Sequence, residues 1–339
     1  MEEKNAKHIN EKPKKKRKAL KIILIILIIL IIIIGALAGT STWYVKNKLS
    51  KVNYTNDVQK NEVSIDEKVE ENLADYRNIA LFGLDTRYDT FNDSRSDCIM
   101  IVSINNKTND VRLLSIYRDT YVDIDGHGLD KFTHAYAFGG AQLALSTLNK
   151  NLDLNISEYV TVNFETVRTI VDQIGGVEMN ITSAEAKSIP GITTAGKYNL
   201  NGEQALAYAR IRKIDTDYKR TERMRNVLSG VFYKAQKMNV SKLNSLLDTM
   251  LPHISTNISP SEILSLIPNV LSYNITESEG WPYNTRGWEV GRWYGIPVTL
   301  EKNVIDLHKN LFGEEDYEPT QTVKDISNRI IEKTVCIQE

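Results

Sequence analysis

The sequence NIALFGL, at Asn78–Leu84, is an unbroken apolar run that ends directly before Asp85. Strands that are buried on both faces of a sheet have this continuous apolar character. Two similar runs follow along the chain, CIMIVSI at Cys98–Ile104 and VRLLSI at Val111–Ile116. Because such runs alternate further on with helix-period stretches, the sequence predicts a single layered α/β domain, with a central mixed sheet flanked by helices.

The rest of the chain supplies the other elements of this domain. Further strands are expected at Tyr121–Ile124, Tyr159–Asn163 and Val177–Ile181. Residues 182–200 are expected to form a surface excursion, and Trp281–Pro297 to be irregular or β. Helices are expected at Ala141–Leu152, Phe164–Ile174, Gly202–Ala209, Tyr218–Met238, Ser241–Leu251, Pro260–Leu271, Leu300–Phe312 and Thr322–Thr334.

The N-terminal region predicts a membrane anchor. Residues 1–21 carry nine Lys or Arg and three acidic residues, and the next 24 residues, Ile22–Val45, carry no charge. At about 1.5 Å per residue this stretch spans roughly 36 Å, which is enough for a tilted membrane helix. The excess of positive charge before the helix predicts a cytoplasmic N-terminus and an extracellular C-terminal domain in the cell membrane. Cleavage after Ala36-Leu37-Ala38 is the alternative, and it would also export the domain.

The domain limits follow from composition. Residues 1–21 form a basic cytoplasmic tail, 22–45 the transmembrane anchor, 46–75 a polar stalk or linker that is partly helical between Ser64 and Ala74, and 76–335 one large domain. The chain has 339 residues and a formal net charge of −1, so the part beyond the tail is acidic, with a net charge of −7. This balance argues against nucleic acid as a partner.

Two cysteines are present, Cys98 and Cys336. A disulfide between them is possible in an exported protein, and plain core packing of Cys98 is the alternative. Neither the cysteines nor the five histidines have the spacing of a metal site. His134 is a candidate acid or base, although packed or surface histidines are commoner.

Charged residues stand where three of the predicted strands begin or end. Asp85 follows the first strand, Asp97 precedes the second, and Arg118 follows the third. Ligands bind at the carboxyl ends of strands in α/β sheets, and two carboxylates there can share Mg²⁺, which prefers oxygen ligands. Surface charges on loops are the alternative for Asp85 and Asp97, but three converging charges favour a site.

Arginine is concentrated between residues 209 and 225, where it takes five positions and lysine takes two. The planar guanidinium binds phosphate oxygens through two parallel hydrogen bonds and stays charged, so this density favours a polyanion site over a solvated basic helix face. Arg220 and Arg223 share one face if the segment is helical. The candidate residues here are Arg210, Arg212, Asp217, Arg220, Arg223 and Arg225.

An ordered set of motifs resembles the LytR-CpsA-Psr family of membrane-anchored cell-wall enzymes over about residues 76–335. The motifs are FGLDTR at Phe82–Arg87, RSD at Arg95–Asp97, SIYRDT at Ser115–Thr120, Lys131 with AYAFGG at Ala135–Gly140, VDQIGGV at Val171–Val177, and LNGEQALAYARIR at Leu200–Arg212, followed by Asp217, Arg220 and Arg223.

The resemblance implies transfer of a glycopolymer from a polyprenyl pyrophosphate carrier to peptidoglycan, through a phosphodiester at the muramic-acid 6-hydroxyl. It implies that Asp85 and Asp97 hold Mg²⁺ and that Arg118, Arg210 and Arg212 bind the pyrophosphate. It also places Arg87, Arg95, Asp217, Arg220 and Arg223 in active-site motifs. We add the hypothesis that Asp85 helps to remove the proton of the acceptor hydroxyl. Met224 follows Arg223, where the family usually has Gln, which puts one polar contact to phosphate in doubt.

Two other functions compete with transfer. A non-catalytic envelope sensor or transcription attenuator would need a separate output partner, because a tail of 21 residues is too short to fold. An exported lipid-pyrophosphate phosphatase would use the same residues with water as acceptor. The sequence does not specify the polymer (teichoic acid, capsule or another secondary polymer) or the oligomeric state. The frequent Ile, Lys and Asn and the scarce Cys suggest a Gram-positive source.

Overall fold

The computed structural model describes residues 47–84, 94–211, 214–215, 217–235, 238, 240–266, 273–289 and 291–335. The predicted tail and anchor and residues Asp85, Arg87 and Arg212 lie outside these ranges. Among the described residues, none of the helices combines the length and the apolar character that a membrane span requires.

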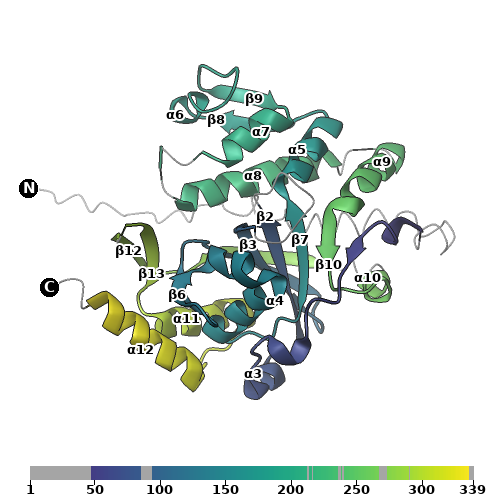
Figure 1. The fold of residues 1–339 in the computed structure, drawn as a ribbon. Helices are drawn as coiled ribbons and strands as arrows, with labels where there is room; N and C mark the ends of the chain where they lie inside the picture. Colours follow the sequence, from purple (N-terminus) through teal and green to yellow (C-terminus); the bar gives the residue numbers. More distant parts are fainter. Residues whose placement is uncertain are drawn as a thin grey trace, which may run out of the picture.

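A seven-stranded mixed sheet forms the centre of the domain (Figure 1), in the order β1-β10-β7-β2-β3-β4-β11. In it β2 runs antiparallel to β3 and parallel to β7, and β11 runs parallel to β4. The predicted fold class is therefore confirmed. The strands are β1 (Asn53–Tyr54), β2 (Tyr76–Leu84), β3 (Ser96–Asn105), β4 (Asp110–Ile116), β7 (Glu158–Asn163), β10 (Ile254–Thr256) and β11 (Asn274–Trp281).

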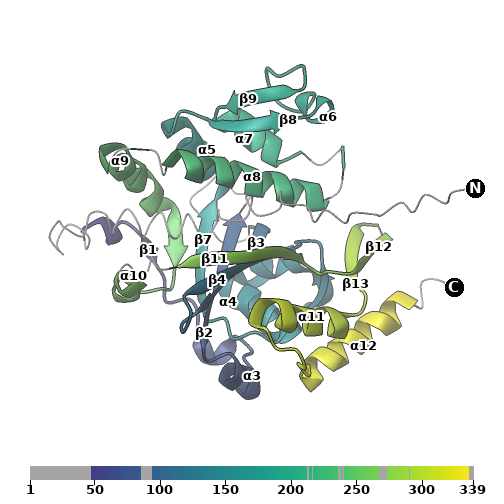
Figure 2. The same cartoon turned by 180° about the vertical axis from the view of Figure 1, so that it is seen from behind.

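Helices cover both faces of this sheet, which explains why its central strands are apolar throughout (Figures 1 and 2). Successive side chains of a strand point to opposite faces. Ile79 and Leu81 pack in a core shared with α5 (Phe164–Gln173), α7 (Gly202–Ala209) and α8 (Asp217–Ala235). Ala80 and Phe82 pack in a second core shared with α4 (Phe132–Leu152), α11 (Leu300–Phe312) and α12 (Gln321–Val335).

Three two-stranded ribbons are added to this sandwich of layers. Residues 182–200 form more than the expected excursion, because they include a helix, α6, and the strand β9. The Thr182 and Glu185 side chains form a capping box that starts α6. The ribbons are β5 (Tyr121–Ile124) with β6 (Gly128–Lys131), β8 (Val177–Ile181) with β9 (Gly196–Leu200), and β12 (Thr285–Glu289) with β13 (Trp293–Pro297); α6 is Ser183–Ala186.

The helix expected from Ala141 begins nine residues earlier, at Phe132, and is kinked at Gly139 and Gly140. Gly140 has φ +61°, a conformation that glycine adopts without the steric cost of a Cβ. The remaining helical elements are η1 (Lys60–Glu62), α3 (Glu67–Asn72), α9 (Val240–Met250), η2 (Leu251–His253) and α10 (Pro260–Leu266).

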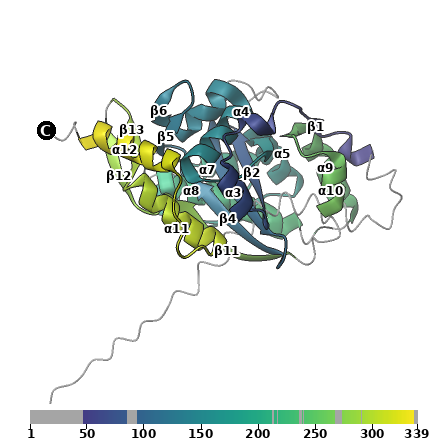
Figure 3. The same cartoon turned by 90° about the horizontal axis from the view of Figure 1, so that it is seen from below.

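Residues 47–75 differ from the expected stalk, because they pack onto the domain. The short strand β1 pairs in parallel with β10 at the edge of the sheet (Figure 3). Leu49 and Val63 are fully buried. The Lys48 ammonium lies 2.6 Å from an Asp248 carboxylate oxygen of α9. Its other buried apolar residues, Val52, Val69 and Leu73, are spread along a polar sequence, so composition alone does not predict that the segment docks.

Cys98 lies in β3, half-buried against the first core. Cys336 lies outside the described residues, so a pairing of the two cysteines stays a prediction.

Candidate active site

The strand register brings the predicted strand ends to one edge of the sheet. Leu84, the last residue of β2, pairs with Ser96 at the start of β3, and Ile116, the last residue of β4, pairs with Ile99. The carboxyl ends of β2 and β4 and the amino end of β3 therefore meet. Asp97 and Arg118 are neighbours at this edge, as the sequence predicts.

A network of buried charges occupies this edge, and we call it the arginine centre: Asp97, Arg118, Asp119, Lys131 and Arg220. The Arg118 guanidinium donates through Nη1 to Asp97 Oδ1. Its Nε lies 3.4 Å from Asp119 Oδ2, and Lys131 Nζ lies 2.8 Å from Asp119 Oδ1. Asp97 and Asp119 are each only 7% exposed, so the carboxylates are held away from bulk water.

Arg220 reaches the arginine centre from α8, which passes over this end of the sheet in Figure 1. The residue is 1% exposed, and its Nη1 lies 3.9 Å from Asp97 Oδ2. Two guanidinium groups thus flank one buried carboxylate. Burying charged side chains is costly, and such groups are commonest where they serve a ligand or a reaction.

Arg223, one turn further along α8, lies in a different set of contacts. It donates through Nε to Glu185 Oε1 at 2.7 Å, through Nη1 to the Ile211 carbonyl at 3.2 Å, and through Nη2 to Asp215. Burial alone would raise the pKa of Glu185, but the hydrogen bonds from Arg223 and from the Thr182 backbone hold it below its ordinary value. Arg223 therefore ties α8 to α6 and to the segment after α7.

The other predicted site residues in the described part of the chain lie at the ends of neighbouring elements. Arg210 is the partly buried residue that ends α7, Arg95 is exposed directly before β3, and Asp217 is the first residue of α8. Of the predicted site residues in the described part of the chain, Asp97, Arg118 and Arg220 are brought into contact.

Lys131 and Asp119 were not singled out as site residues by the sequence, although both lie inside its motifs. Lys131 ends β6 and forms the N-cap of α4, and Asp119 directly follows Arg118. Their pairing depends on how the β5–β6 ribbon folds back beside Arg118, which no local pattern shows.

His134 of α4 contacts Asp130 of β6 and Phe138 of its own helix. Its Nδ1 lies 2.8 Å from Asp130 Oδ2, and its ring lies 5.7 Å from that of Phe138. Burial tends to raise the pKa of Asp130, but the hydrogen bond with His134 and that from the Lys131 backbone lower it overall. These contacts fit the packed alternative for His134.

The arginine centre has the chemistry of a phosphate site with a hard cation. Mg²⁺ is bound in proteins through one or two carboxylates together with substrate phosphates. Asp97 supplies one buried carboxylate, with Arg118 and Arg220 as donors for phosphate oxygens. Within the described residues, three or more acidic, His or Cys groups do not gather around one point, so such an ion would depend on the substrate and on Asp85 for further ligands.

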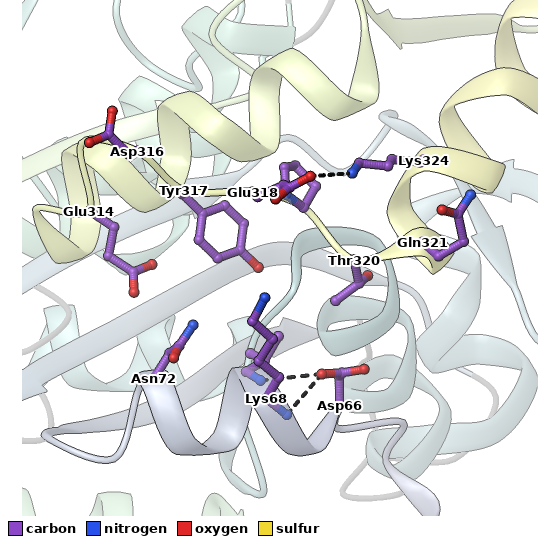
Figure 4. Close-up of a pocket in the computed structure, with 12 residues that line it drawn as sticks. Asp66, Lys68, Asn72, Glu314, Asp316, Tyr317, Glu318, Thr320, Gln321 and Lys324 are labelled. Carbon is purple, nitrogen blue, oxygen red and sulfur yellow. Dashed lines mark hydrogen bonds and ion pairs between the residues drawn. The ribbon is translucent and has the colours of Figure 1, made fainter.

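A groove of about 740 Å³ lies at the other end of β2, between α3 and the loop that joins α11 to α12 (Figure 4). It is lined by acidic, amide and lysine side chains, among them Asp66, Lys68, Glu314 and Lys324, and by none of the predicted site residues. Part of its lining belongs to what we call the tyrosine cluster: Asp153, His308, Glu314, Tyr317 and Thr320.

Comparison with known proteins shows the family to which the domain belongs. The model of the LytR_cpsA_psr family matches residues 41–306. The polyisoprenyl-teichoic acid–peptidoglycan teichoic acid transferase TagT of Bacillus subtilis (strain 168) is 34% identical over 223 residues, which are 62% of this chain and 69% of that protein.

Two solved structures of similar proteins hold bound ligands. TagT bound to LIIa-WTA is 30% identical, with a TM-score of 0.56, over 71% of this chain and 92% of that one. YwtF (TagT) with bound octaprenyl pyrophosphate lipid is 28% identical, with a TM-score of 0.52 and the same coverage. The family model matches most of the length of this chain, and the α/β fold and the ordered motifs around Asp97 and Arg118 agree with that match. This chain therefore belongs to the LytR-CpsA-Psr family.

Proposed function

We propose that this protein attaches a polyprenyl-pyrophosphate-linked glycopolymer to peptidoglycan through a phosphodiester. The observation that carries the proposal is the pair of guanidinium groups, half-buried Arg118 and buried Arg220, on either side of buried Asp97 where β2 and β4 end and β3 begins. Relatives named as teichoic acid transferases, and one solved with octaprenyl pyrophosphate, support this substrate class.

In the proposed reaction the acceptor hydroxyl oxygen bonds to the phosphorus that bears the polymer. The bond from this phosphorus to the bridging oxygen breaks, and polyprenyl phosphate leaves with the electron pair. Phosphoryl transfer needs positioning and charge stabilisation more than covalent help. We assign Arg118 and Arg220, with Arg210 and Arg212, to the pyrophosphate oxygens, and Asp85 to the hydroxyl proton.

We assign Asp85 and Asp97 to a Mg²⁺ ion, which would neutralise charge on the pyrophosphate when bound. Arg87, Arg95 and Asp217 are proposed as further groups around the donor. Arg223 is proposed to position α8, because its guanidinium is bonded to Glu185 of α6 and to Ile211 and Asp215 in the segment after α7.

We further propose that residues 22–45 anchor the protein in the cell membrane with the domain outside. A lipid carrier stays in the bilayer, so an anchored enzyme meets its donor without release of the lipid. The long uncharged stretch after a basic tail supports this topology.

The test uses the full-length chain in detergent with a synthetic polyprenyl pyrophosphate disaccharide, Mg²⁺ and peptidoglycan oligomers, followed by mass spectrometry. A phosphodiester-linked product that Arg118→Ala abolishes would establish the transferase. Release of phosphate without a linked product would identify a lipid-pyrophosphate phosphatase. Tight lipid binding without either product would contradict both enzymatic functions and favour the function of a sensor.

A further inference from the structure

The β12–β13 ribbon carries an exposed tryptophan beside the arginine centre that the proposed reaction does not use. Trp293 is 39% exposed, which is unusual for a side chain of this size in the described part of the domain. Exposed aromatic side chains next to a site are typical of binding surfaces.

Strand pairing sorts the aromatic residues of this ribbon onto two faces. Residues directly opposite each other in an antiparallel pair share a face. Trp288 pairs with Tyr294, and the two rings pack with Tyr121, with centroids 5.2–5.6 Å apart, on the side of the domain core. Trp293 and the glycine pair Gly287–Gly295 lie on the other face.

The two glycines form a flat floor for the indole of Trp293. A Cβ placed on Gly287 would lie 2.8 Å from Trp293 Nε1, and one placed on Gly295 would lie 3.3 Å from Trp293 Cη2. Both ends of the indole therefore rest on bare backbone. One face of the ring is supported while the side chain keeps a large exposed area, so its orientation is fixed before any ligand binds.

This ribbon is joined directly to the arginine centre. The Gly295 backbone N–H donates to the Asp119 carbonyl at 2.9 Å, and Thr120 forms a parallel bridge to Gly295. Lys131, which contacts the Asp119 carboxylate, lies 5.2 Å from the centre of the Tyr294 ring. The backbone under the indole is thus bonded to the residue that follows Arg118.

A second exposed ring lies on the neighbouring part of α4. Phe138 is 45% exposed and stacks on His127 at 4.0 Å between ring centres. Hydrogen-bonding groups lie beside Phe138, because His134, whose ring is 5.7 Å from that of Phe138, is bonded to the Asp130 carboxylate of β6. Figure 3 shows β6 and β13 on the same side of the domain.

We propose that Trp293, with Phe138 as a second exposed ring, is a stacking platform for pyranose rings of the acceptor glycan strand. One face of a pyranose is a patch of C–H groups, which pack on the electron-rich face of an aromatic ring, and its hydroxyls reach polar groups at the rim. This inference rests on the proposed function, since it names the subsite for the acceptor of that reaction.

The acceptor is favoured over the donor because of charge. The donor carries a pyrophosphate, which the arginine centre can hold by itself. The reacting group of the acceptor is a neutral hydroxyl, so the acceptor must be held by uncharged contacts such as stacking. An open, preoriented indole at the rim of a buried charged site supplies such contacts.

The test measures binding of a peptidoglycan tetrasaccharide and of octaprenyl pyrophosphate to the full-length chain by calorimetry, and the acceptor KM in the transfer reaction. Trp293→Ala is expected to weaken tetrasaccharide binding about ten-fold, and Phe138→Ala less. Gly287→Ala keeps the indole but displaces it, because the added methyl group would overlap Nε1, so it is expected to weaken binding as well.

Ile331→Ala is the matched control, since Ile331 is also 39% exposed. Lys333 of the same helix faces Tyr121. Ile331 is two positions from Lys333, or about 200° around α12, so it lies on the opposite side of the helix from this contact. This control and all three platform variants are expected to bind octaprenyl pyrophosphate like the wild type.

The outcomes separate this inference from the proposed function. Transfer by the wild type with an unchanged acceptor KM in Trp293→Ala would overturn the platform alone. A higher KM for the polyprenyl pyrophosphate disaccharide in Trp293→Ala, with unchanged tetrasaccharide binding, would overturn it in favour of the donor. Tetrasaccharide binding that depends on Trp293, without any transfer by the wild type, would support the platform and overturn the proposed function.

Discussion

The two ends of β2 hold buried polar groups in opposite ways. At its carboxyl end, the arginine centre sets three cationic side chains against two carboxylates. At its amino end, where Tyr76 donates to the Phe312 carbonyl, the tyrosine cluster satisfies Asp153 with neutral donors. The Thr320 N–H at 2.8 Å, the Thr320 hydroxyl at 2.7 Å and the Tyr317 hydroxyl at 2.9 Å all donate to this carboxylate.

The difference indicates which end is built to receive a ligand. The donors of the tyrosine cluster come from one short segment after α11, so their hydrogen bonds hold that segment in place. The charges of the arginine centre come from β3, the end of β4, β6 and α8. A phosphate can replace one of these carboxylates as a partner of a guanidinium without loosening a loop. The groove of Figure 4 lies at the amino end of β2, away from the arginine centre.

The largest expected effect is on activity. Arg118→Ala should lower the rate of transfer at least about a hundred-fold, because it removes a preoriented donor to charge that develops on phosphate oxygens. The measurement is the initial rate with saturating donor. Arg118→Lys keeps the positive charge but loses the two parallel hydrogen-bond donors of the guanidinium, so an intermediate rate is expected. Wild-type activity in Arg118→Ala would mean that the arginine centre is structural.

The next effect is on stability. Asp153→Ala should lower the free energy of unfolding by about 3 kcal/mol, because it leaves buried donors without an acceptor. It also places alanine at φ +51°, where asparagine is tolerated better, so Asp153→Asn should cost less. Denaturant unfolding measures both variants. Reduced binding of octaprenyl pyrophosphate by folded Asp153→Asn protein would argue against a purely structural role.

A smaller effect concerns the pH dependence of stability that arises from the contact between Glu185 and Arg223. The pKa of Glu185 is lowered in the folded protein, so its contribution to stability is present above about pH 4.5. The contribution is lost as pH falls through the lowered pKa. Glu185→Gln should cost about 2 kcal/mol at neutral pH and flatten the loss of stability in acid, as followed by unfolding curves between pH 3 and 7. Parallel pH profiles for the two proteins would contradict this assignment.

The smallest effect is expected at the rim of the groove. The Lys324 ammonium lies 3.2 Å from a Glu318 oxygen, and Glu318 is exposed. Lys324→Ala should change the unfolding free energy by less than about 0.5 kcal/mol and leave transfer unchanged, because exposed ion pairs are screened by water. A clear loss of transfer in this variant would give the groove a role in the reaction.

The sequence predicts the fold well where the pattern is local and strong. The bounds of Tyr121–Ile124, Val177–Ile181, Gly202–Ala209 and Leu300–Phe312 agree with the structure. The sequence does not predict the strand β11, because NITESEGW carries four polar or charged residues in a row, and pairing with β4 supplies its register.

The candidate site was predicted in part. Asp97 and Arg118 follow from strand ends, which a sheet register brings together. The sequence does not predict that Arg220 and Arg223 make separate contacts, because both residues lie on one face of a helix. Arg223 contacts Glu185 instead of Asp97 because α6 packs beside it. The assignments to Asp85, Arg87 and Arg212 remain predictions, since these residues lie outside the described part of the chain.

The docking of residues 47–75 sets how far the protein can reach from a bilayer. A flexible linker of 30 residues would let the domain range over roughly 30 Å. Here the chain is bonded to the domain from Lys48 onward, three residues after the proposed anchor ends at Val45. If residues 22–45 span the membrane, the domain works at a fixed height close to the lipid headgroups. The proposed acceptor would then be wall material at the membrane surface, so that coupling of the polymer would keep pace with new wall synthesis while older, outer layers stay out of range.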